Sequence, residues 1–493
     1  MAADAQSQTL GGDGRKLSLV DVVAQSVGFL GPVFSIAFLV PLIVGLISVT
    51  GNGAGVAAPL AILIGGVGIL CVAWIVGAYA RRIHAAGALY DYVTDGLGSK
   101  VGGAAGLVYY LGIIALGGGL LVLIAGTIHD TLLAEFGFEA ISLTVWMILL
   151  LALVAAVMYL GVSLSTRAQL VLAFISIVTV FLFSVYVIVK VGSANDVAAA
   201  FNPASAPGGF SGLLFGMVYG VLIFTGFETA ANLGEETEHP KRDIPRAVIT
   251  SVILVTAFYL VVSYAQVAGY GFSLDAMGAN AGAPLFGLAA PAEAGGYGGV
   301  AIGRLLELVV VLDMLAVLIG ISVAASRGVF AMARDERFPS VLAKVSRRGT
   351  PMNAGVLVLV FFAVVVVLTV GNEDLFAIPD FPHYFAMFSW GSSFGGLALA
   401  VIYFLLCLGA LRGLRGSDKY GLIVVAALVG MLVTAAAVFG AVYQVPEPTI
   451  WAAWAVAIIF VIGLVLAFVV KGSVRETTTF DELTASEQGP QKL

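Results

Sequence analysis

The residues Phe224-Thr225-Gly226-Phe227 interrupt an apolar stretch that is otherwise long enough to form a membrane-spanning helix. A second interruption, Gly28-Phe29-Leu30-Gly31-Pro32, lies in the first apolar stretch, where proline removes a backbone donor and clashes with the preceding turn. Corresponding interruptions in the two halves of a chain point to an inverted-repeat transporter with a binding site at mid-membrane. Because Gly and Pro are common in membrane helices, two ordinary kinks are the alternative that the spacing leaves open.

The composition is that of a membrane protein. Hydrophobic residues make up 60% of the 493-residue chain and charged residues only 11%, whereas soluble domains carry about 25% charged residues. About twelve stretches are long and apolar enough to cross a bilayer, centred near residues 35, 66, 118, 152, 180, 222, 258, 316, 362, 396, 431 and 460. We therefore predict an all-α polytopic membrane protein with one transmembrane domain, residues 17–472, between disordered cytoplasmic tails at 1–16 and 473–493.

The positive charges fall on one side of this arrangement. If the N-terminus is cytoplasmic, all of the 23 Lys and Arg residues except Lys190 and Arg304 fall on the cytoplasmic face. One helix more or fewer would scramble this sorting, so it supports both the helix count and a plasma (inner) membrane orientation with both termini inside. The basic residues are expected to meet anionic lipid headgroups of the bilayer, and no nucleic-acid partner is expected.

Three stretches carry a specific motif pattern. The first runs from Phe224 to Ala247 and combines an aromatic residue, a Gly, an acid, a second acidic pair, and the triplets Pro240-Lys241-Arg242 and Ile244-Pro245-Arg246. The second covers residues 81–90, and the third spans 326–351, with Ser326-Arg327, 331–336, Pro339 and Gly349-Thr350-Pro351. Together they resemble the amino acid–polyamine–organocation (APC) family of permeases. His84 stands where the family usually has Pro, Glu336 replaces a Gly, and Gly31-Pro32-Val33 replaces a Gly-small-Gly pattern.

The resemblance implies a five-plus-five inverted repeat in helices one to ten, with helices one and six broken and helices eleven and twelve peripheral. It also implies transport of an amino acid or related amine by alternating access. In the residues themselves, a broken helix offers unpaired N–H groups and the positive end of a half-helix. We expect the backbone of Gly31, Pro32, Val33, Phe34 and Ser35 to hold the substrate carboxylate, and that of Phe224, Thr225, Gly226 and Phe227 to face the ammonium. The hydroxyls of Ser35 and Thr225 are further candidate contacts.

Two carboxylates within the apolar stretches are candidate coupling or gating residues, because a charge at membrane depth is costly and usually functional. Glu228 follows the second interruption and matches the family's acidic position; the alternative is a structural role in stabilising the break. Asp313, well inside the eighth stretch, is expected to pair with a substrate amine or a cation, or else with Arg304 or a hydroxyl.

The aromatic residues form a second group of candidates. Phe34, Phe224 and Phe227 are candidates for the walls and gates of the pocket. In the family, helices three and ten line the pathway, which adds Tyr109, Tyr110, Phe388 and Trp390. For any one of these rings, core packing or lipid contact is the alternative.

The coupling ion stays open between H⁺ and Na⁺. Ser322 and Ser326 offer oxygens for sodium, although such residues also bond backbone carbonyls in membrane helices. Proton-coupled cationic members of the family often carry a Lys in the middle of helix five, but residues 168–189 contain none, and Ser176 lies near the comparable depth.

The residue pattern points away from an enzyme. The four histidines, His84, His129, His239 and His383, are dispersed without metal-ligand spacing, and no nucleophile–base constellation stands out. No cofactor or metal is therefore expected. The leading hypothesis is a secondary active transporter of an amino acid or amine, with cation (H⁺) symport favoured over two alternatives: an exchanger and a non-transporting substrate sensor. The substrate identity and the oligomeric state are not readable from the sequence.

Overall fold

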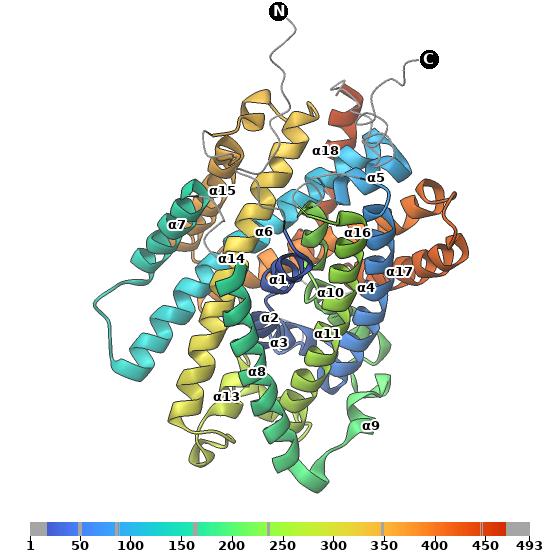
Figure 1. Cartoon of the computed structure of the whole chain (residues 1–493). Helices are drawn as coiled ribbons and strands as arrows, with labels where there is room; N and C mark the ends of the chain where they lie inside the picture. The colour runs from blue at the N-terminus through green and yellow to red at the C-terminus, as the bar shows by residue number, and fades with distance from the viewer. Residues whose placement is uncertain are drawn as a thin grey trace, which may run out of the picture.

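The computed structural model describes residues 17–469 except 48–51, 84–86, 88, 161–165, 234–236, 347–349, 444 and 446. Within this part of the chain there are α-helices, short 3₁₀ helices and no β-strand (Figure 1). The two predicted tails, residues 1–16 and 473–493, lie outside the described residues, as does His84.

The described residues of the first half of the chain form nine α-helices. They are α1 (Leu19–Leu30), α2 (Pro32–Phe38), α3 (Val40–Val44), α4 (Ala58–Ala80), α5 (Leu89–Leu97), α6 (Ser99–Phe136), α7 (Leu143–Leu160), α8 (Thr166–Val191) and α9 (Val197–Ala200). The second half contains α10 (Phe210–Leu222), α11 (Pro240–Gly269), α12 (Leu274–Gly278), α13 (Pro284–Ala289), α14 (Val300–Arg334), α15 (Met352–Gly371), α16 (His383–Gly413), α17 (Tyr420–Gly440) and α18 (Ile450–Val469). The 3₁₀ helices are η1 (Gly55–Ala57), η2 (Gly192–Ala194), η3 (Pro203–Ser205), η4 (Phe227–Leu233), η5 (Ala292–Ala294) and η6 (Ser340–Ala343).

The described helices account for the predicted membrane spans. Eleven segments are long and apolar enough to cross a bilayer, and the apolar helix Leu143–Tyr159 is somewhat shorter. Each of the twelve predicted centres falls within one of these segments. The prediction of an all-α, multi-pass membrane protein is therefore confirmed.

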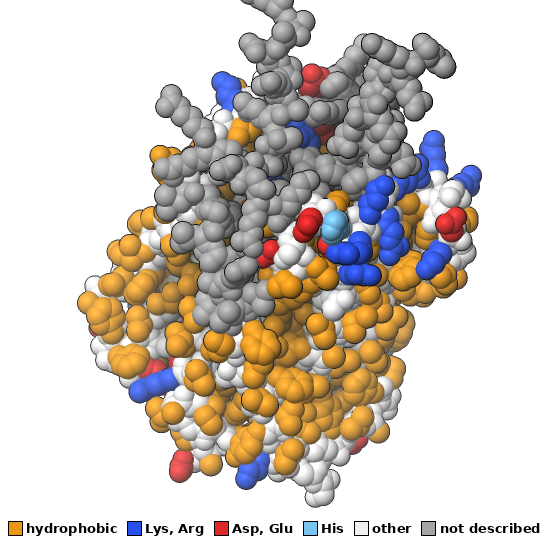
Figure 2. Space-filling view, in the orientation of Figure 1, with side chains coloured by type: hydrophobic (Ala, Val, Ile, Leu, Met, Phe, Trp, Pro, Cys, Tyr) orange, Lys and Arg blue, Asp and Glu red, His pale blue; other side chains and the backbone are white. Residues whose placement is uncertain are grey.

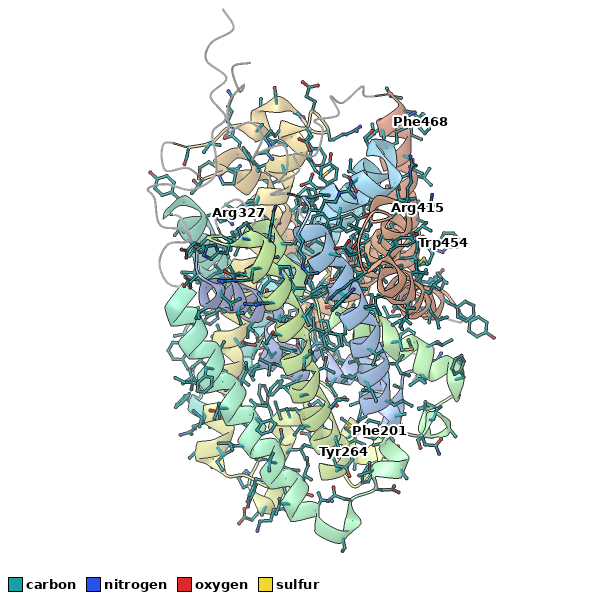
Figure 3. All side chains as sticks on the ribbon, turned by 45° about the vertical axis from the view of Figure 1, so that its right-hand side comes forward. Phe201, Tyr264, Arg327, Arg415, Trp454 and Phe468 are labelled. Atoms are coloured by element: carbon teal, nitrogen blue, oxygen red, sulfur yellow. The ribbon has the colours of Figure 1, made fainter. Side chains whose placement is uncertain are left out.

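The two ends of the bundle differ in charge. Figure 2 shows Lys and Arg side chains gathered toward the upper end, while apolar side chains cover the flank below it. Figure 3 places Arg415 and Phe468 toward this upper end, which we call the basic end, and Phe201 and Tyr264 toward the other, the distal end. Arg304, one of the two exceptions in the charge pattern, pairs with Glu135 at the distal end of α6 (Nε–Oε2 distance 2.6 Å).

Glycines permit the close packing of the spans around the centre. The ridge of Gly212, Gly216 and Gly220 on α10 faces neighbouring backbone, as expected for tight helix packing. A β-carbon on Gly65 of α4 would lie only 2.5 Å from the carbonyl oxygen of Gly220. The long helix α6 lies deep in the bundle and packs along α16, α14 and α18.

Candidate functional site

The first span is broken at Gly31. The helix α1 ends at Leu30 and α2 begins at Pro32, with Gly31 in the left-handed conformation (φ 50°) between them. Glycine adopts this conformation without the steric cost that a β-carbon brings, and proline is suited to the first position of the next helix because it lacks an N–H. The pair Gly31-Pro32 is thus the physical cause of the break.

The backbone donors released by this break are already bonded. Asp313 Oδ2, from α14, accepts hydrogen bonds from the N–H groups of Val33 (3.0 Å) and Phe34 (2.8 Å). The Asp313 side chain is buried. A carboxylate at the start of a helix is stabilised by the N–H groups and by the helix dipole, so Asp313 fixes α14 against the first break. These donors belong to the segment that we expected to hold a substrate carboxylate.

The sixth span unwinds at the predicted interruption. The helix α10 ends at Leu222, residues 223–226 form turns, and the chain continues as the 3₁₀ helix η4. Gly226 has φ 115°, and a β-carbon there would lie 2.9 Å from Leu30 N and 2.2 Å from Phe29 Cδ1. Ser26 Oγ also donates to the carbonyl of Phe227 (3.2 Å). The two breaks are therefore in direct contact, as the predicted architecture requires.

Glu228 is the acceptor at the centre of a buried hydrogen-bond network. Its Oε1 accepts from the Tyr109 hydroxyl of α6 (3.1 Å), and its Oε2 accepts from the Tyr403 hydroxyl of α16 (3.0 Å) and from Gly226 N (3.0 Å). Burying a carboxylate requires such compensation. Glu228 thus stabilises the sixth-span break while linking it to two further spans, and this geometry is compatible with both roles that the sequence left open.

A small cavity lies beside the two breaks. Its volume is about 10 Å³, close to the space that one water molecule requires. Of the nine residues predicted to bind substrate, Phe34, Ser35 and Thr225 line it; the other lining residues are Phe29, Leu30, Leu39, Leu116, Leu222, Val317 and Ile321. The site is thus contracted and mainly apolar in this conformation.

The two hydroxyls in the cavity are oriented by the breaks themselves. Ser35 Oγ donates to Leu30 O (3.0 Å), and Thr225 Oγ1 donates to Leu222 O (2.6 Å). A hydroxyl that donates its proton in this way keeps lone pairs for accepting a further hydrogen bond. Both hydroxyls can therefore serve as acceptors for a donor in the cavity.

A second, larger cavity of about 940 Å³, which we call the vestibule, lies at the distal end. It is bounded by the ends of α3 and α6, by residues 278–290 and by residues 378–385. Asp130 lies in its wall, where it accepts a hydrogen bond from the Tyr384 hydroxyl and contacts His129 Nδ1 (2.9 Å).

Four phenylalanine rings separate the vestibule from the small cavity. We call Phe34, Phe38, Phe385 and Phe388 the aromatic layer. Neighbouring rings make a closed cycle of contacts with centroid distances between 5.9 and 6.4 Å. Phe38 and Phe385 line the vestibule and Phe34 lines the small cavity, so the layer lies between the two cavities.

The remaining predicted residues lie as follows. Phe224 packs edge-on against Tyr259, and Phe227 packs against Tyr403. Tyr110 donates to Gly87 O (3.2 Å), and Trp390 stacks between Phe376 and Phe394. The two candidate sodium ligands, Ser322 and Ser326, donate to Leu318 O and Val323 O within their own helix, and Ser176 donates to Val309 O (3.4 Å).

Sequence reasoning missed Tyr403, which donates to Glu228 across 175 residues of sequence, and the apolar cavity residues Leu116, Val317 and Ile321. No local signal distinguishes these positions, because each lies in a continuous apolar helix. Only the three-dimensional packing of α6, α14 and α16 identifies them.

Comparison with known proteins identifies the family of this chain. The model of the amino acid permease family matches residues 29–470, and the chain therefore belongs to this family. The family consists of transporters and not of enzymes, which confirms the predicted class. The predicted five-plus-five repeat itself remains a prediction.

The branched-chain amino acid permease BcaP of Lactococcus lactis subsp. cremoris is 25% identical over 57% of this chain and 61% of its own length. The Bacillus subtilis protein of the same name is 26% identical over 61% and 65%. The chain thus aligns with somewhat less than two thirds of these relatives. Among solved structures, a mutant of the Eremococcus coleocola manganese transporter covers 91% of this chain and 95% of its own, with a TM-score of 0.54 and 11% identity. At that identity the likeness concerns the fold alone.

Proposed function

We propose that this chain is a secondary transporter that carries a neutral amino acid with an apolar side chain across the plasma membrane by alternating access. The observation that supports this most directly is the contracted cavity between two contacting helix breaks, separated from a vestibule by the aromatic layer. Its walls are mainly apolar, and its polar groups are backbone atoms and two hydroxyls.

The cavity lining favours this substrate class. An ammonium group donates hydrogen bonds, and the free lone pairs of Ser35 and Thr225 can accept them. The side chains of Leu30, Leu116, Val317 and Ile321 provide an apolar surface for an aliphatic substrate side chain. The name of the two BcaP relatives is consistent with such a substrate.

The substrate carboxylate competes with Asp313 in this proposal. Because Asp313 holds the N–H groups of Val33 and Phe34, a substrate carboxylate can reach them only after Asp313 withdraws. Protonation of Asp313 would weaken its charge-assisted bonds and release these donors. We therefore propose that Asp313 takes up H⁺ when substrate binds. We also propose that Glu228 is protonated in the opposite access state.

The orientation follows from the charge distribution. We propose that the basic end faces the cytoplasm, because positively charged segments are retained there. The vestibule then opens to the exterior, and in this conformation the external side is accessible down to the aromatic layer.

The decisive experiment is uptake by the purified protein in proteoliposomes. We expect saturable uptake of leucine, driven by an inward H⁺ gradient and insensitive to a Na⁺ gradient. Uptake that requires amino acid inside the vesicle would establish an exchanger instead. Saturable binding without uptake would identify a sensor, and uptake driven by Na⁺ alone would refute the role of Asp313.

A glycine pair tests the site itself. In Gly31→Ala the new β-carbon would lie 2.0 Å from Val317 Cγ2, and the left-handed conformation costs an L-residue about 1–2 kcal/mol. We expect this variant to lose leucine uptake while it still reaches the membrane. The matched control is Gly28→Ala, three residues earlier in the same span, where a β-carbon meets no atom within 4 Å. Equal uptake by the two variants would contradict the proposed site.

A further inference from the structure

A recess of about 230 Å³ lies at the basic end of the bundle, away from the breaks and the vestibule. It is formed by the start of α6, the last turn of α14, the segment that follows α14 and the last turns of α18. Its walls are largely apolar and include Leu107, Phe338 and Leu466. Leu466 is itself exposed on the flank of the bundle, so the recess lies where a bilayer would meet the protein.

Small residues create this space. A β-carbon on Gly463 of α18 would lie 2.8 Å from Cα of Ala104, so α6 and α18 are in close contact at this level. Gly103 lacks a side chain on the recess side, where its β-carbon would lie 3.6 Å from Arg337 Nε. Because Gly103 has no side chain, the guanidinium group of Arg337 lines this side of the recess.

One cation, Arg337, lines the recess, and a second, Lys100, lies beside it on the same turn of α6 as Gly103. Arg337 Nη2 donates to Ser99 O (3.2 Å), but the Nε of the same guanidinium is buried and has no hydrogen-bond partner in the described structure. Lys100 is exposed, and its Nζ lies 3.8 Å above the ring of Phe468, which Figure 3 labels at the basic end of α18. The acidic residues Asp335 and Glu336 precede Arg337, and both already have interactions of their own.

The positive charge of Arg337 lines the recess, so the recess favours a ligand with anionic oxygens. The same ligand must also cover apolar walls that open on the flank of the bundle. A phosphate group joined to acyl chains meets both requirements, because guanidinium and ammonium groups bind phosphate oxygens strongly. Basic recesses between helices on the cytoplasmic side are known to suit anionic lipid headgroups.

We propose that this recess binds an anionic phospholipid of the cytoplasmic leaflet, with its phosphate at Arg337 and Lys100 and an acyl chain along Leu107 and Leu466. The proposal depends on the orientation given above, but not on the substrate or on the coupling ion. A lipid in this position would join α6 and α18 to the segment that follows α14.

Native mass spectrometry of the full chain tests the proposal. Detergent-purified protein is mixed with phosphatidylglycerol or with phosphatidylcholine of the same acyl chains. We expect phosphatidylglycerol to be retained preferentially, and Arg337→Gln to reduce its retention about five-fold, the equivalent of ~1 kcal/mol for one basic residue. The matched control is Arg415→Gln, which removes an exposed arginine from the same end and should leave retention unchanged.

A second variant keeps the test valid if Arg337→Gln fails to fold. Ala467→Trp fills the recess without changing any charge and should also reduce the retention of phosphatidylglycerol. Equal retention of the two lipids, or wild-type retention in both variants, would overturn the proposal. Displacement of the lipid by millimolar inorganic phosphate would also overturn it, because the recess would then bind the free anion. None of these measurements requires transport, so they stand apart from the test of the proposed function.

Discussion

Asp313 holds two backbone N–H groups of α2, and its variants separate hydrogen bonding from charge. Asn at this position keeps an acceptor oxygen for Val33 and Phe34, whereas Ala leaves both N–H groups buried without a partner. Each such orphaned group costs about 1–3 kcal/mol. We expect Asp313→Ala to unfold at a clearly lower temperature than Asp313→Asn in the same detergent. Identical melting temperatures would mean that the two bonds contribute little to stability.

Glu228 offers a test of coupling at the same scale. Gln preserves size and keeps one acceptor oxygen among Tyr109, Tyr403 and Gly226, but it does not take up a proton. We expect Glu228→Gln to lose H⁺-driven accumulation of leucine while counterflow exchange survives. Glu307→Gln, a carboxylate nearer the distal end of α14, is the control and should accumulate normally. A Glu228→Gln protein with unchanged dependence on external pH would exclude the coupling role.

The residues of the site differ in how far the sequence predicts them. Glu228 stands out because a charge within an apolar stretch is rare, and Gly31 stands out because proline follows it. The bonds from Asp313 to the first break were not foreseen, since 280 residues separate it from Val33. An isolated acid signals that it needs a partner but does not indicate which one.

At the scale of helices, the contact between α4 and α10 depends on the absence of side chains at Gly65 and Gly220. Alanine normally favours a helix over glycine by up to about 1 kcal/mol, but at position 65 its β-carbon would meet the Gly220 carbonyl at 2.5 Å. We expect Gly65→Ala to lower the melting temperature, because overpacking costs about 1–3 kcal/mol. Gly421→Ala on α17, where a β-carbon meets nothing within 4 Å, should not lower it.

The helices themselves were predictable because a span must be apolar over its whole length. The breaks in the first and sixth spans were also predictable, because Gly31-Pro32 marks the first and Gly226 marks the second. The short helices α5, α12 and α13 were not predicted, because long apolar stretches do not indicate helices of nine residues or fewer. The start of α3 at Val40 was missed as well, although Pro41 lies at its beginning.

For the whole molecule, the proposed orientation predicts which surfaces a membrane-impermeant thiol reagent can reach. Asn280 borders the vestibule, and Asp418 lies exposed between α16 and α17 at the basic end. In a background where Cys71 and Cys407 are replaced by Ser, we expect Asn280→Cys to be labelled in intact cells. Asp418→Cys should be labelled only after the membrane is opened. The reverse labelling pattern would mean that the basic end faces the exterior, which would contradict the proposed orientation.

The sorting of Lys and Arg agrees with the spans of the described residues, which are eleven apolar segments long enough to cross a bilayer and the shorter helix Leu143–Tyr159. It did not predict which spans touch. The packing of α16 along α6 depends on small residues such as Gly112, whose β-carbon would meet Ala398 at 2.6 Å. Such complementarity between distant helices is a property of shape, and a one-dimensional pattern does not contain it.

The aromatic layer has a thermal consequence. Its four rings are joined by apolar contact, so each turnover must expose hydrocarbon to the water of the vestibule before a solute can pass. Hydration of newly exposed apolar surface raises the heat capacity. The activation enthalpy of uptake should therefore change with temperature, and an Arrhenius plot of initial rates should be curved in a bilayer that stays fluid throughout.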